Sequence, residues 1–385
     1  MSRWRTLLAP GSAGVVYALI ALLTVLAVSV ELRGRPAYLT STNLSNILDQ
    51  AALVGLLAVF TTVVLISGNF DLSVASNAAL CGCVALKTVD RHGPVIAVLA
   101  ALAVGLVFGL VNGLLVQWVK INAFIVTLAT MTAGRGIVLI LTDGRTVTSA
   151  STALDALERS TWPVEPARVI GLATVVAGAA SLLVWRGGVR RIALPLMLGG
   201  AALATFGLVA GHAWKITSAV WFLLVGTCMV GFVLKFTVVG RRLYAVGGNA
   251  DAARLSGIAV NRYKVAAFAL NGTMCGFVGV LYASRLGAIN PDAISGTELT
   301  VLAAAILGGT SLFGGAGSAF KSVVGALILF VLSNGFNILN LGSNYQGLVQ
   351  GVVILAAAAT YSVTGLSRRR VPDAQTSGRS DGADS

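Results

Sequence analysis

Apolar runs long enough to cross a bilayer recur along the whole chain, and short polar segments separate them. A helical crossing of the hydrocarbon core takes about 20 apolar residues, and its backbone groups must bond to each other because water is absent. The pattern therefore predicts an all-α, polytopic membrane protein with about ten to twelve spans. The expected spans are residues 13–31, 48–67, 72–87, 94–119, 122–142, 168–185, 192–211, 216–235, 265–284, 299–312, 318–338 and 346–366.

Two regions do not have the pattern of plain crossings. Residues 48–87 and 299–338 contain short or glycine-interrupted apolar runs, which are consistent with hairpins, broken helices or re-entrant segments. Residues 367–385 are polar and contain no aromatic residue, so we expect a disordered tail there. The predicted organisation is a transmembrane domain at residues 1–366, a polar loop at 236–264 within it, and that tail.

Composition supports a membrane protein, because 56% of residues are hydrophobic and only 11% are charged. A soluble domain has about 25% charged residues. Lys and Arg gather in alternate loops, and the positive-inside rule then predicts that both termini, the tail included, are cytoplasmic. No small-residue cleavage site follows residues 13–31, so this run is expected to remain as the first span. The longest outer loop, residues 143–167, contains a plausible short helix from Thr152 to Arg159.

The net charge of +13 needs no nucleic acid as a partner. Much of it is the positive-inside signal, and the chain lacks the basic pattern with interleaved aromatic residues that a nucleic-acid-binding face shows. Catalytic motifs are also missing. The nearest approach to a phosphate-binding loop, "GGAGSAFKS" at residues 314–322, has its lysine in the wrong place, and no metal-ligand cluster occurs. We therefore expect no enzyme activity and no cofactor bound by this chain.

Ionisable residues within the apolar runs are few: Asp71, Arg135 and Glu298. A charge at a helix centre costs about 2.5–3.5 kcal/mol on insertion scales, so each should face protein or water. Asp71 is either a helix N-cap at a break or a functional group. Glu298 suits the first turn of a helix, and Arg135 either snorkels or pairs with a carboxylate. Three scattered charges do not make a proton relay.

The stretch "VVGRRLYAVGGNADAARLSGIAVNRYKV", residues 238–265, is polar and basic between apolar neighbours. Asn249 is a good N-cap, Asp251 falls in the first turn, and Gly257 is a natural terminating residue. The predicted helix has about two turns, far fewer than the ~12–15 residues an isolated helix needs in water. Either a cytoplasmic partner holds it, or it is an ordinary capped loop helix on the membrane surface.

The segments "ISGNFDLSVAS" and "NAFIVTLATMTAGRG", with "AVGGNADAARLSGI" and "ELTVLAAAILGGTSLFGG", resemble the permease subunits of bacterial ABC sugar importers of the ribose and xylose type. The resemblance covers residues 40–365. It implies a permease of the inner membrane that dimerises, receives sugar from an extracytoplasmic binding protein and is driven by a separate cytoplasmic ATPase, which binds ATP and Mg²⁺. Residues 249–256 would then be the helix that docks in the ATPase.

Two departures from the family pattern affect the expected substrate. The signature begins "GNF" at Gly68 to Phe70, where the family has two glycines and an isoleucine. Residues 143–240 are longer than in ribose-type members and resemble the xylose-type branch. We therefore expect a monosaccharide, with a pentose such as xylose favoured. The alternatives are a branched-chain amino-acid-type permease and a self-sufficient secondary transporter.

Two sets of candidate site residues follow. The set expected to couple to the ATPase comprises Gly247, Gly248, Asn249, Asp251, Ala253, Arg254, Leu255 and Gly257. The set expected at the translocation pathway or its gate comprises Asp71, Asn112, Glu298, Thr310 and Asn334. For Asn112 and Asn334 the alternative is a hydrogen bond between helices, which is worth about 0.6 kcal/mol in membranes.

Overall fold

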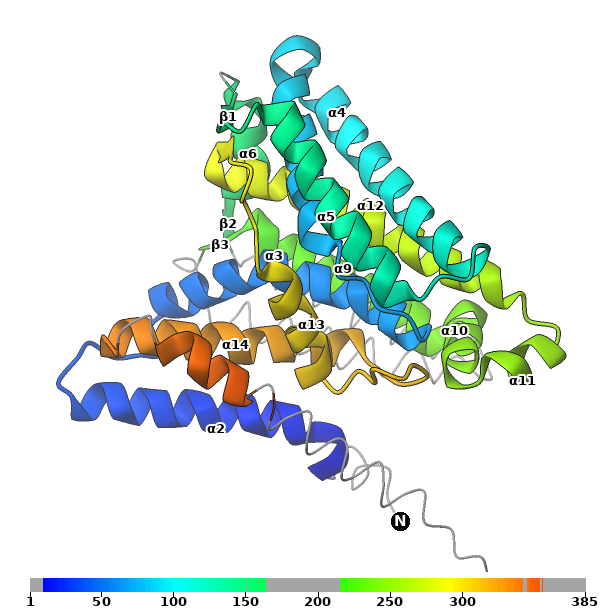
Figure 1. Ribbon diagram of the computed structural model, residues 1–385. Helices are drawn as coiled ribbons and strands as arrows, with labels where there is room; N and C mark the ends of the chain where they lie inside the picture. The colour runs from blue at the N-terminus through cyan, green and yellow to red at the C-terminus, as the bar shows by residue number, and fades with distance from the viewer. Residues whose placement is uncertain (1–9, 150, 164–214, 342–344, 354, 356–385) are drawn as a thin grey trace, which may run out of the picture.

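The computed structural model describes residues 10–149, 151–163, 215–341, 345–353 and 355. Helices make up nearly all of the described chain (Figure 1). The long helices are α2 (Pro10–Leu32), α3 (Ser41–Ile66), α4 (Val74–Gln117), α5 (Ala123–Thr142), α9 (Ser218–Phe236), α12 (Val260–Leu286) and α14 (Ala319–Leu339). The shorter helices are α6 (Asp155–Arg159), α10 (Val238–Gly248), α11 (Ala250–Leu255) and α13 (Thr297–Leu307), with a 3-10 turn, η1 (Thr152–Leu154).

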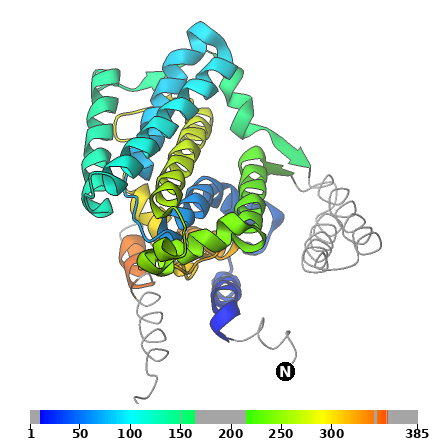
Figure 2. The ribbon, with the colours of Figure 1, turned by 90° about the vertical axis from the view of Figure 1, so that its right-hand side faces the viewer.

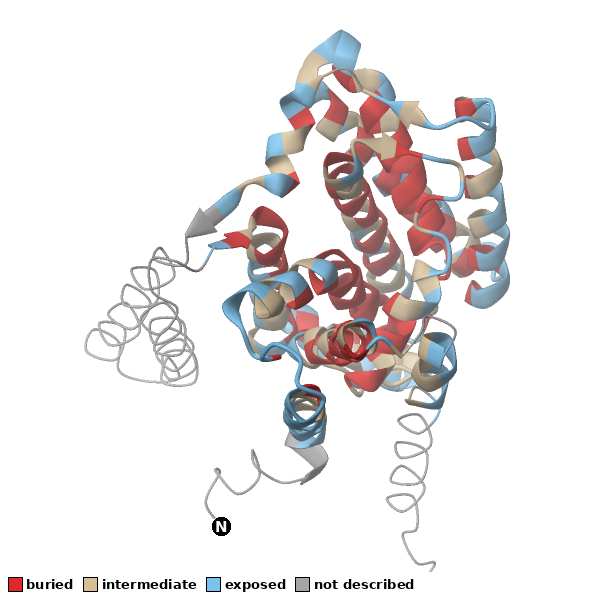
Figure 3. Ribbon diagram, turned by 90° about the vertical axis from the view of Figure 1, so that its left-hand side faces the viewer, coloured by how far each residue is buried: buried red, intermediate tan, exposed pale blue. Residues whose placement is uncertain are grey.

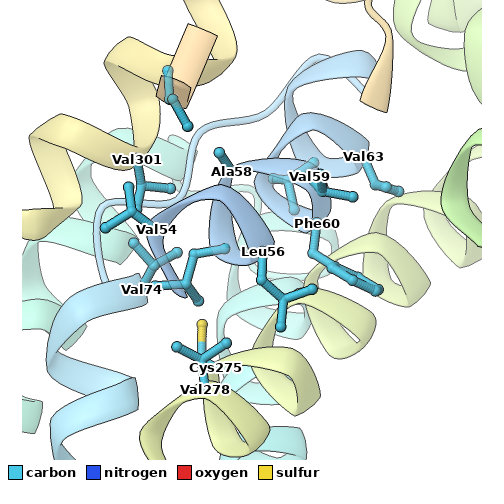
Figure 4. Close-up of a cluster of buried hydrophobic side chains, with 14 of the residues drawn as sticks. Val54, Leu56, Ala58, Val59, Phe60, Val63, Val74, Cys275, Val278 and Val301 are labelled. Atoms are coloured by element: carbon cyan, nitrogen blue, oxygen red, sulfur yellow. The ribbon is translucent and has the colours of Figure 1, made fainter. Parts of the chain in front are cut away.

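Helix α3 lies at the centre of the structure. Every residue from Ala51 to Ile66 is buried, as expected of a helix that is apolar on all sides. Figure 4 shows residues of this helix, among them Leu56 and Phe60, gathered with Cys275 and Val278 of α12. In Figure 3 the buried residues concentrate in this inner layer, while α2 and α5 carry exposed residues along much of their lengths. The exposed faces are apolar, as in helices that contact lipid.

Helix α4 is two antiparallel arms joined at Gly93. The φ of Gly93 is 79° and its ψ is 171°, a conformation available essentially to glycine, and Pro94 then starts the second arm. Figure 1 shows the chain rising along one arm, turning at the top and descending along the other. The separate spans expected at 72–87 and 94–119 are therefore confirmed as two crossings within one element.

Helix α12 packs against both arms of α4, as the side view also shows (Figure 2). A Cβ at Gly82 of the first arm would lie 2.8 Å from the Gly279 carbonyl oxygen, and one at Gly105 of the second arm would overlap the Gly272 carbonyl oxygen. Small residues thus let the helix backbones touch, which is the usual basis of helix association in lipid. This packing makes α3, α4 and α12 one body.

The two ends of the structure differ. One end holds α10, α11 and the turn between α4 and α5, and the other holds the Gly93 turn and all four short strands (Figure 1). There β1 (Val147–Thr148) pairs antiparallel with β4 (Ala288–Ile289), with Val147 opposite Ile289. Likewise β2 (Thr161–Pro163) pairs antiparallel with β3 (Lys215–Thr217), with Trp162 opposite Ile216.

An ion-pair cluster fastens the strand-bearing end. The Arg285 guanidinium at the end of α12 lies 2.6 Å from Glu158 of α6 and 3.0 Å from Asp49 of α3. The Glu158 carboxylate is almost fully buried, so its charge is compensated by Arg285 at short range. The helix expected from Thr152 to Arg159 is confirmed, with its first turn in the 3-10 form.

The expectation of a polytopic all-α membrane protein is confirmed, since seven described helices are long and apolar enough to span a bilayer. The region 299–338 is a broken segment, one of the alternatives expected for it: α13 has only 11 residues, the chain leaves the helix at Gly308, and α14 follows. Residues 345–353 are helical, in agreement with the start of the last expected span. Expectations for 168–185, 192–211 and the tail at 367–385 lie outside the described residues.

Candidate functional site

The polar stretch forms two short helices, α10 and α11, at one end of the molecule. Thr237 starts α10, since its hydroxyl accepts a hydrogen bond from the Gly240 amide. Leu243 and Val246 are buried on one side of α10, and Arg241 and Arg242 are exposed on the other. The amphipathic pattern therefore attaches α10 to the body of the protein and leaves a basic face free.

Asn249 caps α11 as the sequence predicts. Its side-chain oxygen accepts hydrogen bonds from the amides of Asp251, at 3.1 Å, and Ala252, at 2.9 Å. Its backbone is extended, with φ −157° and ψ 100°, so Asn249 both ends α10 and begins α11. Such a cap stabilises a helix by about 1 kcal/mol, a large share for an element of six residues.

Gly257 ends α11 in a Schellman arrangement. Its φ is +78°, its amide donates to the Arg254 carbonyl, and the Ile258 amide donates to the Ala253 carbonyl, both at 3.0 Å. Ile258 also belongs to a small apolar cluster with Ala253, Val246 and Val260. This contact is the hydrophobic one that accompanies the motif. The cluster attaches α11 to α10 and to the start of α12.

The remaining surface of α11 is open. The Leu255 side chain is 91% exposed, and the Asp251 and Arg254 side chains form an exposed pair at 3.3 Å. Pairs of this kind contribute little to stability. Helix α11 is thus a rigid, capped projection with an apolar residue at its tip and an opposite-charge pair beside it.

Backbone contacts join α10 to the break between α3 and α4. A Cβ at Gly247 would overlap the carbonyl oxygen of Ile66 and lie 2.7 Å from the Gly315 amide nitrogen. Gly68 has a φ of +80°, and a Cβ added there would lie 3.7 Å from the Gly247 backbone. Only glycine fits at residue 247, so the end of α10 rests directly on the main chain that follows α3.

A third segment, the loop between α13 and α14, completes this contact. A Cβ added at Gly314 would lie 2.7 Å from the Gly68 Cα, and one added at Gly315 would lie 2.6 Å from the Gly248 Cα. Both Gly314 and Gly315 have positive φ. The Tyr244 hydroxyl of α10 donates a 2.8 Å hydrogen bond to the Gly317 carbonyl. Burial raises the pKa of Tyr244, so this hydroxyl keeps its proton at neutral pH. We call these three contacting segments, residues 66–68, 247–248 and 314–317, the glycine junction.

Three residues beyond the junction, Asp71 is the centre of a buried polar network. One carboxylate oxygen accepts hydrogen bonds from the Ser73 amide, at 2.9 Å, and the Ser73 hydroxyl, at 2.6 Å. The other accepts from the Asn271 amide group of α12, at 2.9 Å. The expectation that Asp71 caps a helix is wrong in detail: Ser73 occupies the N-cap position of α4, and Asp71 forms an Asx turn just before it.

Asn112 belongs to the same network. Its Nδ2 donates to the Ser73 hydroxyl at 2.9 Å, and the Thr61 hydroxyl of α3 donates to Asn271 at 3.3 Å. The network therefore links α3, both arms of α4 and α12 just inside the glycine junction. Asp71 is 2% exposed, and the described residues place no cation within ion-pair distance of its carboxylate. Asp71 and Asn112 were expected at the pathway and Asn271 was not, although Asn271 precedes Gly272 in an apolar run just as Asn112 precedes Gly113.

The other three pathway candidates lie apart from this network. Glu298 is in the first turn of α13, as expected, and accepts a hydrogen bond from the Gly296 amide. Thr310 is buried near Gly317, and its hydroxyl has no hydrogen-bond partner within the part of the chain that the structure describes. Asn334 of α14 donates to the Asn43 side chain of α3 at 2.9 Å, a hydrogen bond between helices. The structure does not bring the five candidates into one site.

Arg135 of α5 neither snorkels nor forms an ion pair among the described residues. Its guanidinium donates to the carbonyl oxygens of Ala293, at 2.6 Å, and Pro291, at 3.3 Å. The carboxylates of Asp292 and Glu298 lie close enough to interact with it electrostatically. Arg135 therefore attaches α5 to the turn that precedes α13.

Comparisons with known proteins agree with this architecture. The model of a family described as "Branched-chain amino acid transport system / permease component" matches residues 43–358. The xylose transport system permease protein of Escherichia coli (strain K12) is 40% identical over 343 residues, which cover 85% of this chain and 86% of that protein. The corresponding xylose protein of Haemophilus influenzae is 35% identical over 361 residues, which cover 89% and 94%.

The ribose import permease protein of Escherichia coli (strain K12) is 35% identical over 340 residues, covering 88% of this chain and 91% of that protein. No solved structure matches the chain. The match to the family model includes the glycine junction, the Asp71 network and both α10 and α11. The chain belongs to the family of branched-chain amino acid transport system permease components and is a permease subunit of the ABC transporter type.

Proposed function

We propose that this chain is the membrane-spanning subunit of an ATP-driven importer for a monosaccharide, with a pentose such as xylose as the favoured substrate. The relatives reported above are named as permease proteins for xylose transport and ribose import, and they are 35–40% identical to this chain over most of its length. The complete importer would contain two copies of this chain, a cytoplasmic ATPase and an extracytoplasmic sugar-binding protein. ATP and Mg²⁺ would bind only the ATPase.

The observation that carries the proposal is the pair α10 and α11. A capped helix of six residues that projects an exposed leucine and an exposed opposite-charge pair has the form of a docking element. The proposed contact surface for the ATPase comprises Asn249, Asp251, Arg254 and Leu255. Ala253 and Gly257 fix the shape of α11, and Gly247 and Gly248 join α10 to the junction.

The proposed orientation follows from this role. With α11 facing an ATPase in the cytoplasm, the proposal puts both termini on the cytoplasmic side of the inner membrane, as the distribution of Lys and Arg also favours. The strand-bearing end, fastened by Arg285 and Glu158, then faces the binding protein. Clusters of Lys and Arg on the α10 side support this arrangement by the positive-inside rule.

The glycine junction gives the proposed route of coupling. When the ATPase moves α10, the backbone contacts at Gly247 and Gly315 move residues 66–68 and the loop before α14, because no side chain lies between these main chains to absorb the motion. Asp71 and Asn112, just beyond, would then shift α3, α4 and α12 relative to each other. We propose this network as the inner gate, and keep Glu298, Thr310 and Asn334 as pathway candidates of lower rank because they lie apart from it.

A reconstituted transport assay tests the substrate class. The chain, its ATPase and its binding protein are placed in liposomes, and uptake of labelled xylose, ribose and leucine is measured with and without ATP. We expect ATP-dependent uptake of a monosaccharide and none of leucine. Leucine uptake would favour the second candidate, a branched-chain amino-acid permease, which the description of the matched family supports. Uptake without ATP would contradict both.

A further inference from the structure

A basic cavity lies beside α11 and shares Arg254 with the proposed ATPase contact and Gly68 with the glycine junction. It has a volume of about 590 Å³, within the range of about 300–1,000 Å³ that is typical of small-molecule sites. Its walls come from the break after α3, the turn between α4 and α5, α11 and the start of α12. The cations that line it are Lys120, Arg254 and Lys264, and no carboxylate lines it.

The charge in this cavity is unbalanced. Neither the Lys120 nor the Lys264 side chain makes a hydrogen bond or ion pair with another described residue. Arg254 pairs only with Asp251, a side chain that is 90% exposed and does not line the cavity. The N-termini of α5 and α12, marked by Asn122 and Asn261, also open onto it and add the positive ends of two long helix dipoles. The cavity therefore favours an anion.

Lys120 supports a functional role for this site. Its φ is +62°, a left-handed conformation that a residue with a side chain adopts at some cost in free energy. Such conformations concentrate at ligand sites. The turn that holds Lys120 is closed by a hydrogen bond from the Ile121 amide to the Leu115 carbonyl, so the backbone keeps the lysine at the cavity wall.

The surface next to the cavity is apolar and open. Trp118 is 68% exposed and Phe124 is 52% exposed, with Val119 and Ile125 exposed beside them. Tryptophan is enriched at the level of lipid headgroups, and basic pockets between membrane helices on the cytoplasmic side bind anionic headgroups.

We infer that this cavity binds the phosphate group of an anionic phospholipid, with its acyl chains along Trp118 and Phe124. The inference does not depend on the substrate, and its test rests on Lys120 and Lys264, which are not part of the proposed ATPase contact. It predicts that the chain retains phosphatidylglycerol in preference to phosphatidylcholine. It also places that lipid beside α11, where the headgroup balances the positive charges of Lys120, Arg254 and Lys264 that line the cavity.

Native mass spectrometry of the full chain, purified without its ATPase, tests the inference. Titration with phosphatidylglycerol and with phosphatidylcholine measures retention of each lipid. The variant carries Lys120→Gln and Lys264→Gln, and the matched control carries Arg241→Gln and Arg262→Gln, two exposed cations that do not line the cavity. We expect the first pair to weaken phosphatidylglycerol binding about 30-fold, as about 1 kcal/mol for each cation near a membrane surface predicts, and the control to change it by less than about threefold.

Three results would overturn the inference. Equal retention of the two lipids would remove the preference for an anion. Equal losses in the variant and the control would show that general surface charge, rather than the cavity, attracts the lipid. Displacement of phosphatidylglycerol by millimolar inorganic phosphate would assign the cavity to a free anion. A thermal-unfolding measurement of each variant in detergent checks folding, so a loss of binding in a folded variant counts in favour of the site.

Discussion

The Gly315 amide donates a 2.9 Å hydrogen bond to the carbonyl oxygen of Ile66, 249 positions earlier in the chain (315 − 66). Ile66 is the last residue of α3, and Gly315 lies in the loop that leads to α14. Gly247 at the end of α10 lies against both. The two halves of the chain and the proposed docking element therefore meet at one set of backbone atoms, and this contact is the basis of the predictions on coupling.

Gly247→Ala should uncouple the transporter. The added Cβ would overlap the Ile66 carbonyl oxygen, so α10 must shift or the contact must open. Overpacking of this kind costs about 1–3 kcal/mol. We expect uptake to fall while ATP hydrolysis in the assembled complex continues. The control is Gly231→Ala in α9, where nothing lies within 4 Å of the added Cβ. Normal, tightly coupled uptake by Gly247→Ala would show that the junction does not transmit motion.

Asn249→Ala should loosen α11 alone. Two amides, those of Asp251 and Ala252, lose their acceptor, at a cost of about 1 kcal/mol to the helix. Hydrogen exchange measured by mass spectrometry should accelerate about fivefold across residues 250–255 and stay unchanged in α12. Asn249→Asp, which keeps the cap, should exchange like the wild type. Unchanged exchange in the alanine variant would mean that packing, rather than the cap, holds α11.

Arg254→Glu should abolish transport and leave the protein folded and inserted. Arg254 is exposed and its pair with Asp251 is weak, so the fold gains little from it, whereas a charge reversal at a docking surface costs affinity. Uptake assays and affinity capture of the ATPase measure the effect. Arg254→Lys should keep a large part of both. Normal uptake by Arg254→Glu would remove α11 from the coupling contact.

Asp71 and Asn271 should show energetic coupling. Asp71→Ala leaves three donors without an acceptor, and each buried unsatisfied group costs about 1–3 kcal/mol. Asp71→Asn keeps one acceptor oxygen and should lose less stability. Thermal unfolding of Asp71→Ala, Asn271→Ala and the double variant measures the coupling. Additive losses would show that the hydrogen bond between the two side chains carries no energy.

The same variants test Asp71 as part of the gate. Asp71→Asn should lower the uptake rate or change sugar preference, because the network links three helices at the proposed inner gate. Uptake and competition between xylose and ribose are measured at matched protein levels. If rate and preference both stay the same, Asp71 serves only to shape the turn before α4.

Local features of the fold are predictable from the sequence. The caps of α11 at Asn249 and Gly257 lie where the residue types place them, since helix termination depends on neighbours in the chain. Helix α3 and the two arms of α4 are also predictable, because their apolar runs are long enough to cross a bilayer. The shortness of α13 is predictable only in part, because Gly308 and Gly309 mark an interruption in the sequence but do not say whether the helix continues through them.

Contacts between distant segments are not predictable from one sequence. The glycines at 68, 247 and 314 are visible as glycines, but nothing in their neighbours says that they touch. Asn271 has the same Asn–Gly pattern as Asn112, so the sequence marks it as a candidate, but its contact with Asp71, 200 positions earlier, is visible only in the structure. The cavity cations are likewise scattered over Lys120, Arg254 and Lys264, and each alone is explained by the positive-inside rule.

The most direct test of coupling through α10 and α11 is affinity capture from native membranes. The chain is tagged, solubilised gently, and its companions are identified by mass spectrometry. We predict a stoichiometric ATPase with a phosphate-binding loop, and its loss when Arg254 is changed to Glu. A chain that is captured alone and still moves solute across liposomes without ATP would contradict the account and favour a secondary transporter.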